Sequence, residues 1–163
     1  MFRMINVLKI IESSLLRSRK GVFMDQPTNL NLRITGTEQN VMKAANAAAR
    51  IIKKDSPSEY FEARVKNMLE NNFKTTGDSD MAEFSVMEEC YWAIYEEDIS
   101  AIADAIVEAS PDVKFHLSAC ITITYEEGYD LCVDIDYADG EMTKDVSEEY
   151  YEDEEEEDEE EDE

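Results

Sequence analysis

Apolar and polar residues alternate through much of the last third of the chain, and this pattern restricts the fold more than any other feature of the sequence. Most odd-numbered residues from 113 to 137 are apolar, in two runs: Val113, Phe115, Leu117, Ala119, Ile121, Ile123 and Tyr125, then Tyr129, Leu131, Val133, Ile135 and Tyr137. Successive side chains of a strand point to opposite faces, so each run predicts a strand with one buried face. Together the two runs predict an antiparallel hairpin.

The parity of the loop, meaning an odd or even number of residues, gives an expected register for this hairpin. A two-residue loop would place Tyr125 opposite Asp130 and mix the two faces, whereas a three-residue loop at 126–128 places Tyr125 opposite Tyr129. Gly128 can supply the left-handed conformation that such a loop needs. The predicted partners are then Ile123–Leu131, Ile121–Val133, Thr124–Asp130, Cys120–Asp134 and Ser118–Asp136.

The residues before the hairpin predict a strand followed by two helices. The strand covers Leu30 to Ile34 and stops at Gly36. Thr37 is the expected N-cap of a helix with an apolar stripe from Val41 to Ile52. Ser58 is the expected cap of a second helix. The residues expected on its buried side are Phe61, Val65, Met68, Leu69 and Phe73.

Further strands and a third helix complete the predicted domain. Residues 81–95 allow two short strands, and a helix with Asp98 as its cap then runs to Ser110-Pro111. After the hairpin, the tight turn at Asp139-Gly140 leads into a short strand over 142–146. This order predicts an α+β fold with helices on one face of a mostly antiparallel sheet, and we expect a ferredoxin-like arrangement.

Three segments carry a family resemblance. They are the helix and strand from Ile99 to Phe115, the turn Glu127-Gly128-Tyr129, and the residues Tyr137-Ala138-Asp139-Gly140. Together they resemble the ferredoxin-like domain of small phage and plasmid proteins over about half of the domain. The resemblance implies a mobile-element setting and contributes no catalytic motif, and the polyacidic C-terminus of this chain departs from that pattern.

The charge of the chain is strongly negative, with 40 acidic and 15 basic side chains and a formal net charge of −25. Residues 148–163 contain fourteen acids and two tyrosines, and this composition predicts a disordered tail. The remaining 26 acids still outnumber the 15 bases. This balance disfavours direct binding of nucleic acid or of an anionic membrane.

Residues 1–23 differ in character from the domain predicted over 24–147. Five basic residues oppose only Glu12, and apolar residues recur at helical spacing, so the segment predicts a basic amphipathic helix. An import presequence is one alternative. Another is that translation naturally starts at Met24, because Arg19-Lys20-Gly21-Val22 can be encoded by a bacterial ribosome-binding sequence; the segment would then be a non-native extension.

The residues that usually carry catalysis are poorly placed for it. His116 is the only histidine, and on one strand face it lies about 13 Å from Cys120, beyond the reach of a nucleophile–base pair. The five glycines form no phosphate-binding motif. The three cysteines are widely spaced, which favours free thiols in a reducing, cytoplasmic compartment. We therefore expect a protein that is not an enzyme and needs no metal or cofactor.

Negative charge on two separate elements is the feature that points to a function. The expected partner-binding residues lie on the hairpin and in the tail: Glu126, Glu127, Asp130, Asp134, Asp136, Asp139 and Glu141, with Glu154, Glu155, Glu156 and Glu157. Such an array can occupy the cationic groove of a basic nucleic-acid-binding protein, such as a nuclease or defence effector. The chain is thus similar in charge to anti-CRISPR and anti-restriction mimics of nucleic acid. The alternative is an accessory or histone-chaperone-like module whose tail gives solubility or binds basic proteins.

Overall fold

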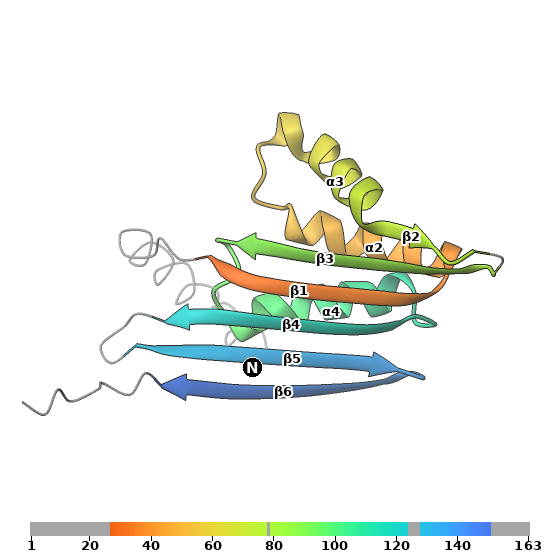
Figure 1. Cartoon of the computed structure of the whole chain (residues 1–163). Coiled ribbons are helices and arrows are strands. Elements are labelled where there is room, and N and C mark those ends of the chain that lie inside the picture. The colour runs from red at the N-terminus through yellow and green to blue at the C-terminus, as the bar shows by residue number, and fades with distance from the viewer. Residues whose placement is uncertain (1–26, 78, 124–127, 151–163) are drawn as a thin grey trace, which may run out of the picture.

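The computed structural model describes residues 27–77, 79–123 and 128–150 of the chain. Within these ranges the elements follow the order β1 (Thr28–Thr37), α2 (Glu38–Ile52), α3 (Ser58–Asn72), β2 (Phe73–Thr75), β3 (Met81–Cys90), α4 (Glu96–Ala109), β4 (Lys114–Ile123), β5 (Tyr129–Ala138) and β6 (Glu141–Tyr150). The strands form one antiparallel sheet in the order β2-β3-β1-β4-β5-β6 (Figure 1). The predicted α+β class and antiparallel sheet are confirmed.

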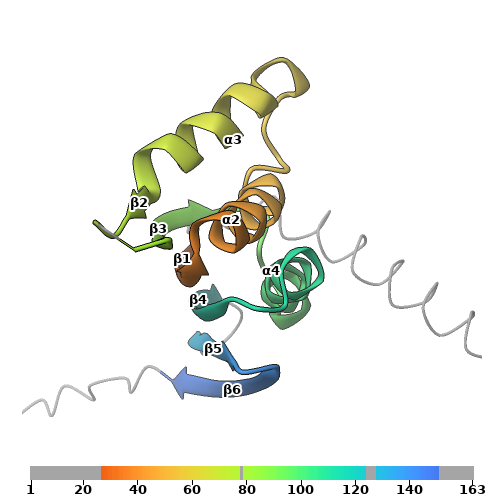
Figure 2. The ribbon, with the colours of Figure 1, turned by 90° about the vertical axis from the view of Figure 1, so that its right-hand side faces the viewer.

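The helices leave one face of the sheet uncovered. Helices α2 and α4 lie side by side against one face, and α3 lies beyond α2, toward the β2 edge (Figure 2). In the part of the chain that the structure describes, no helix lies on the opposite face, which we call the outer face. None of these helices is long and apolar enough to cross a bilayer.

The core lies between the sheet and helices α2 and α4. Its strand residues are the apolar positions predicted by alternation, including Leu32, Leu117 and Ile135, each with no exposed surface. Four fully buried alanines of α2 allow that helix to lie close to the sheet: Ala44, Ala45, Ala48 and Ala49. The α3 helix is less deeply packed than predicted, since only Val65 and Met68 of its apolar side are fully buried.

The region 81–95 contains one strand rather than two. Strand β3 pairs with β1 along its whole length, from Thr37 opposite Met81 to Thr28 opposite Cys90. Because β1 offers ten pairing positions, a single long strand satisfies backbone groups that two short strands would leave open. Trp92 lies in the connection that follows and donates from Nε1 to the carbonyl oxygen of Ile52 at 3.0 Å.

Two helix starts also differ from their predicted positions. Pro57, not Ser58, is the N-cap of α3, and Tyr95, not Asp98, is the N-cap of α4. Asp98 acts one turn later, where its Oδ2 accepts from the amides of Ile94 and Tyr95 at 3.0 and 3.1 Å. The acid therefore still caps the helix, but from inside the first turn.

The β4–β5 hairpin has the predicted parity but a different register. Ile123 pairs with Tyr129, so the connection is 124–128 and every pair is shifted by two residues from the prediction. On the outer face His116, not Ser118, lies opposite Asp136, and Ser118 lies opposite Asp134. Parity distinguishes odd from even loop lengths only, so it could not choose between three and five residues. Gly128 has the expected positive φ, at 53°.

Strand β6 is longer than the predicted strand over 142–146. It runs from Glu141 to Tyr150, and all ten residues are exposed. It pairs with β5 through the two-residue turn Asp139-Gly140, whose φ values of 54° and 83° fit a type I′ turn. Residues 148–150, which were predicted to belong to a disordered tail, are therefore strand. The rest of the predicted tail lies outside the described residues, and so does the helix predicted in 1–23.

Candidate functional site: an acidic face on β5 and β6

The outer face of the last two strands carries a concentrated set of carboxylates. Alternation directs the even-numbered residues of β5 and the odd-numbered residues of β6 to this face. Six of these ten positions are acidic and none is basic. We call the six residues the acidic face: Asp130, Asp134 and Asp136 on β5, with Glu141, Asp145 and Glu149 on β6.

The turn at Asp139-Gly140 places acids of the two strands directly opposite one another. A two-residue turn pairs Ala138 with Glu141, and the same register then pairs Asp134 with Asp145 and Asp130 with Glu149. Like charges directly opposite on adjacent strands destabilise a sheet by about 0.2–1 kcal/mol per pair. The hairpin thus holds two repulsive pairs on a surface that no described helix covers.

The acidic face is accessible to a partner. The side chain of Asp136 is 64% exposed and that of Asp134 is 45% exposed. Asp145 and Glu149 are exposed, and Asp130 is half-buried. The three aspartates expected to share one face of β5 do so, away from the helices.

Two basic side chains of β4 lie near this array. His116 on β4 lies 2.8 Å from Asp136 through Nδ1 and 3.9 Å from Asp134 through Nε2. Lys114 lies 3.4 Å from Asp139 at the hairpin turn. Two basic side chains cannot balance the six carboxylates and Asp139, so the face keeps a net negative potential.

The expected partner-binding residues are only partly brought together. Asp130, Asp134, Asp136 and Glu141 belong to the acidic face, and Asp139 lies in the turn beside it. The other expected residues lie outside the described residues: Glu126, Glu127, Glu154, Glu155, Glu156 and Glu157.

Sequence reasoning missed Asp145 and Glu149, although the sequence contained the signal. A type I′ turn at Asp139-Gly140 fixes the β5–β6 register, and continuing that register places both acids opposite aspartates of β5. The strand predicted over 142–146 ends before Glu149, and it contains Asp145 but carries no predicted register against β5.

The cysteines of the hairpin also differ from the prediction. The predicted register places Cys120 opposite Asp134, but the observed register places it directly opposite Cys132. Their Sγ atoms lie 2.9 Å apart. The shift of two residues that moved Asp136 opposite His116 also produced this pair.

The basic residues near the end of α2 have partners within the protein. Arg50 contacts Glu62 at 2.8 Å, and this contact raises the pKa of Arg50 and lowers the pKa of Glu62. Lys53 contacts Glu88 at 2.5 Å, and Lys54 lies 3.8 Å from the centre of the Trp92 ring. These partners account for the three cations without a nucleic-acid ligand.

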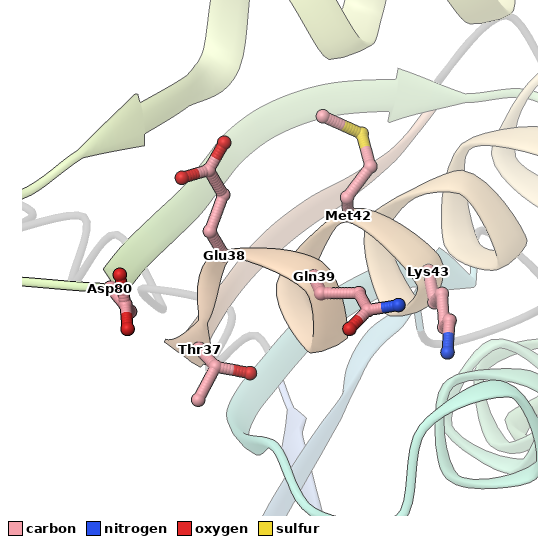
Figure 3. A pocket seen from close by; sticks show the side chains of 6 residues that line it. All are labelled: Thr37, Glu38, Gln39, Met42, Lys43 and Asp80. Atoms are coloured by element: carbon pink, nitrogen blue, oxygen red, sulfur yellow. The ribbon is translucent and has the colours of Figure 1, made fainter.

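A surface hollow lies at the start of α2. Its volume is about 640 Å³, and it lies between the first turns of α2 and Asp80 (Figure 3). All six lining residues are exposed: Thr37, Glu38, Gln39, Met42, Lys43 and Asp80. Among the described residues, no group of three or more histidine, cysteine, aspartate or glutamate side chains could hold a metal ion.

Comparison of the chain with protein-family models, with curated proteins and with solved structures gives no significant match. The function is therefore argued from the acidic face.

Proposed function

We propose that this chain is a non-enzymatic acidic binding protein that engages a basic nucleic-acid-binding protein by imitating a nucleic-acid strand. The acidic face is the binding surface, and residues 151–163, which follow it in the sequence, add twelve acids. The partner belongs to the class of basic nucleases and defence effectors, and the setting is a phage or other mobile element.

The observation that carries this proposal is that two acids of β5 lie directly opposite two acids of β6. A need for solubility alone is met by separated acids, which cost the fold nothing. Asp134 opposite Asp145 and Asp130 opposite Glu149 instead lower the stability of the hairpin. A cationic partner removes that cost, because a lysine or arginine between two carboxylates interacts favourably with both.

The density of charge also supports imitation of nucleic acid. Ten-residue strands carry these outer positions over about 27 Å, at about 3.4 Å per residue. Six acids over that length give about one charge per 4–5 Å, close to the spacing of one phosphate per 3.4 Å along one strand of DNA. Binding should therefore be rapid and should weaken steeply as salt is raised.

The arrangement of the other elements supports a ferredoxin-like assignment for the domain. The order β1, α2, β2, β3, α4, β4 has the β-α-β-β-α-β pattern of that fold, with α3 inserted before β2. On this assignment the β5–β6 part of the sheet is an addition beyond the four common strands. The acidic face would then belong to the element that distinguishes this chain.

Competition with DNA tests the proposal. The full chain is added at low salt to a basic DNA-cleaving nuclease and its DNA, and cleavage is measured. We expect inhibition that disappears in a face variant carrying Asp130→Asn, Asp134→Asn, Asp145→Asn and Glu149→Gln. A matched variant, with exposed acids changed elsewhere, should inhibit as the wild type does: Asp55→Asn, Asp104→Asn, Glu108→Gln and Asp112→Asn.

A third variant separates the face from the tail. It carries glutamine at 154–157 and keeps the acidic face. If only this variant loses inhibition, the tail and not the sheet is the binding element. No inhibition by the wild type across several basic nucleases would favour the solubility role.

A further inference from the structure

Of the two opposed cysteines, Cys132 lies among the residues of the acidic face and Cys120 lies beside them on β4. On β5, Cys132 stands between Asp130 and Asp134, and its partner across the ladder is Cys120 of β4. Both thiols are free and half-buried on the outer face. Cys90, in contrast, is a buried residue of the core, only 3% exposed.

The backbone places these cysteines at a spacing that a disulfide can bridge. Directly opposite residues of an antiparallel pair have Cα atoms about 4.5 or 5.5 Å apart. A disulfide needs about 4.4–6.8 Å, so either kind of pair can be linked without moving the strands apart. The Sγ–Sγ contact of 2.9 Å indicates that the side chains already point toward one another.

We propose that Cys120 and Cys132 form a reversible dithiol–disulfide site on the outer face, oxidised by small neutral or cationic disulfides, that links β4 to β5 beside the aspartates. This site goes beyond the proposed function and does not depend on it. Its product would hold the strand that carries Asp130, Asp134 and Asp136 to its neighbour.

The reaction is two successive thiol–disulfide exchanges. The thiolate of one cysteine attacks a sulfur of the reagent, forms a mixed disulfide and expels one reagent thiolate, which takes up a proton. The second cysteine then loses its proton and attacks the protein sulfur of the mixed disulfide, and the second reagent thiol leaves. The two cysteines are oxidised by two electrons, and the reagent disulfide is reduced to two thiols.

The charged groups around the pair should select the oxidant. Burial, the hydrogen bond with Cys120 and the negative charges of Glu149 and Asp130 raise the pKa of Cys132 to about 12. Asp134 follows Cys132 on the same face of β5, and the next outer positions across the sheet, Ser147 of β6 and Asn29 of β1, are neutral. An anionic reagent must therefore approach against a net negative field, whereas a cationic reagent is attracted by it.

Intact-mass analysis of the full-length, freshly reduced protein tests the proposal. The probes are cystamine, 2-hydroxyethyl disulfide and glutathione disulfide, which are cationic, neutral and anionic, each at low salt. We expect loss of two hydrogens and a Cys120–Cys132 linked peptide, with Cys90 still a thiol. After normalisation to free cysteine, cystamine should react roughly tenfold or more faster than glutathione disulfide, and about 1 M salt should largely remove the difference.

Variants and stability supply the controls. Cys120→Ser and Cys132→Ser should each stop at a mixed disulfide with the probe, whereas Cys90→Ser should still form the link. A disulfide that closes the loop from Cys120 to Cys132 should raise the thermal midpoint of the oxidised protein by about 5–10 °C. Reduction should reverse the change.

Two outcomes would overturn the proposal. One is a wild type that accumulates only mixed disulfides with the probe, because the thiols would then be accessible but unable to join. The other is no reaction of either thiol with cystamine at low salt. Both are read from the wild type, so they stand even if a variant folds poorly.

Discussion

Neutralising one member of a like-charge pair should make the protein more stable. Asp134 and Asp145 lie directly opposite, where side-chain β-carbons are about 4.5–5.5 Å apart. Two unit charges about 5 Å apart repel by about 0.8 kcal/mol in a water-like dielectric. Asp134→Asn or Asp145→Asn should therefore raise the free energy of unfolding by about 0.2–1 kcal/mol, with a rise of about 1–4 °C in the thermal midpoint.

The double variant provides the decisive comparison. Once one charge of the pair is gone, removing the other relieves no further repulsion between them. Asp134→Asn with Asp145→Asn should thus gain about as much as one single change, less than the sum of the two. Asp112→Asn, which removes an exposed acid from the loop before β4, is the control and should change stability little.

Urea unfolding at low ionic strength is the appropriate assay, because the repulsion between the two carboxylates is screened least there. About 1 M salt should shrink the difference between wild type and single variants, since the Debye length falls to about 3 Å. If both single variants are less stable than wild type, or if the two gains add in full, the repulsion we infer does not exist.

Three further predictions concern the fold. Asp98→Ala should lower stability by about 1–2 kcal/mol in denaturant unfolding, because it removes the acceptor of two backbone amides at the start of α4; an unchanged value would mean that water replaces the carboxylate. Gly140→Ala should cost about 1 kcal/mol through backbone strain alone, since φ is 83° and nothing lies within 4 Å of an added β-carbon; equal thermal midpoints would contradict the type I′ turn. Burial raises the pKa of Cys90 from 9.0 to about 12, so as the pH rises the unfolded chain loses the thiol proton before the folded protein does. The free energy of unfolding should therefore fall between those pH values. The fall should be shallower in Cys90→Ala, and identical slopes would refute the raised pKa of Cys90.

Period-two alternation predicted much of the sheet, because burial of one face leaves a clear record in the sequence. The buried faces of β1, β4 and β5 were all predicted in this way. A strand with no buried face shows no alternation of apolar and polar residues, and for this reason β6 was predicted too short. A strand exposed on both faces can be placed only through its pairing with a neighbour.

The candidate site depended on register as well as on parity. Three aspartates of β5 were predicted to share a face, and they do. Their neighbours were not predicted correctly, because loops of three and five residues give the same parity: His116 opposite Asp136 and Cys120 opposite Cys132 both follow from the longer loop. The Asp139-Gly140 turn has one favoured length, so the β5–β6 register could have been derived from the sequence alone.

A nuclear magnetic resonance titration of the full chain with a short oligoarginine peptide at low salt tests the central claim most directly. The account predicts that the largest shifts fall on the outer positions of β5 and β6, led by Asp134 and Asp145, and that the peptide binds the face variant much more weakly. Shifts of equal size on β1 and β3, or undiminished binding to the face variant, would contradict it.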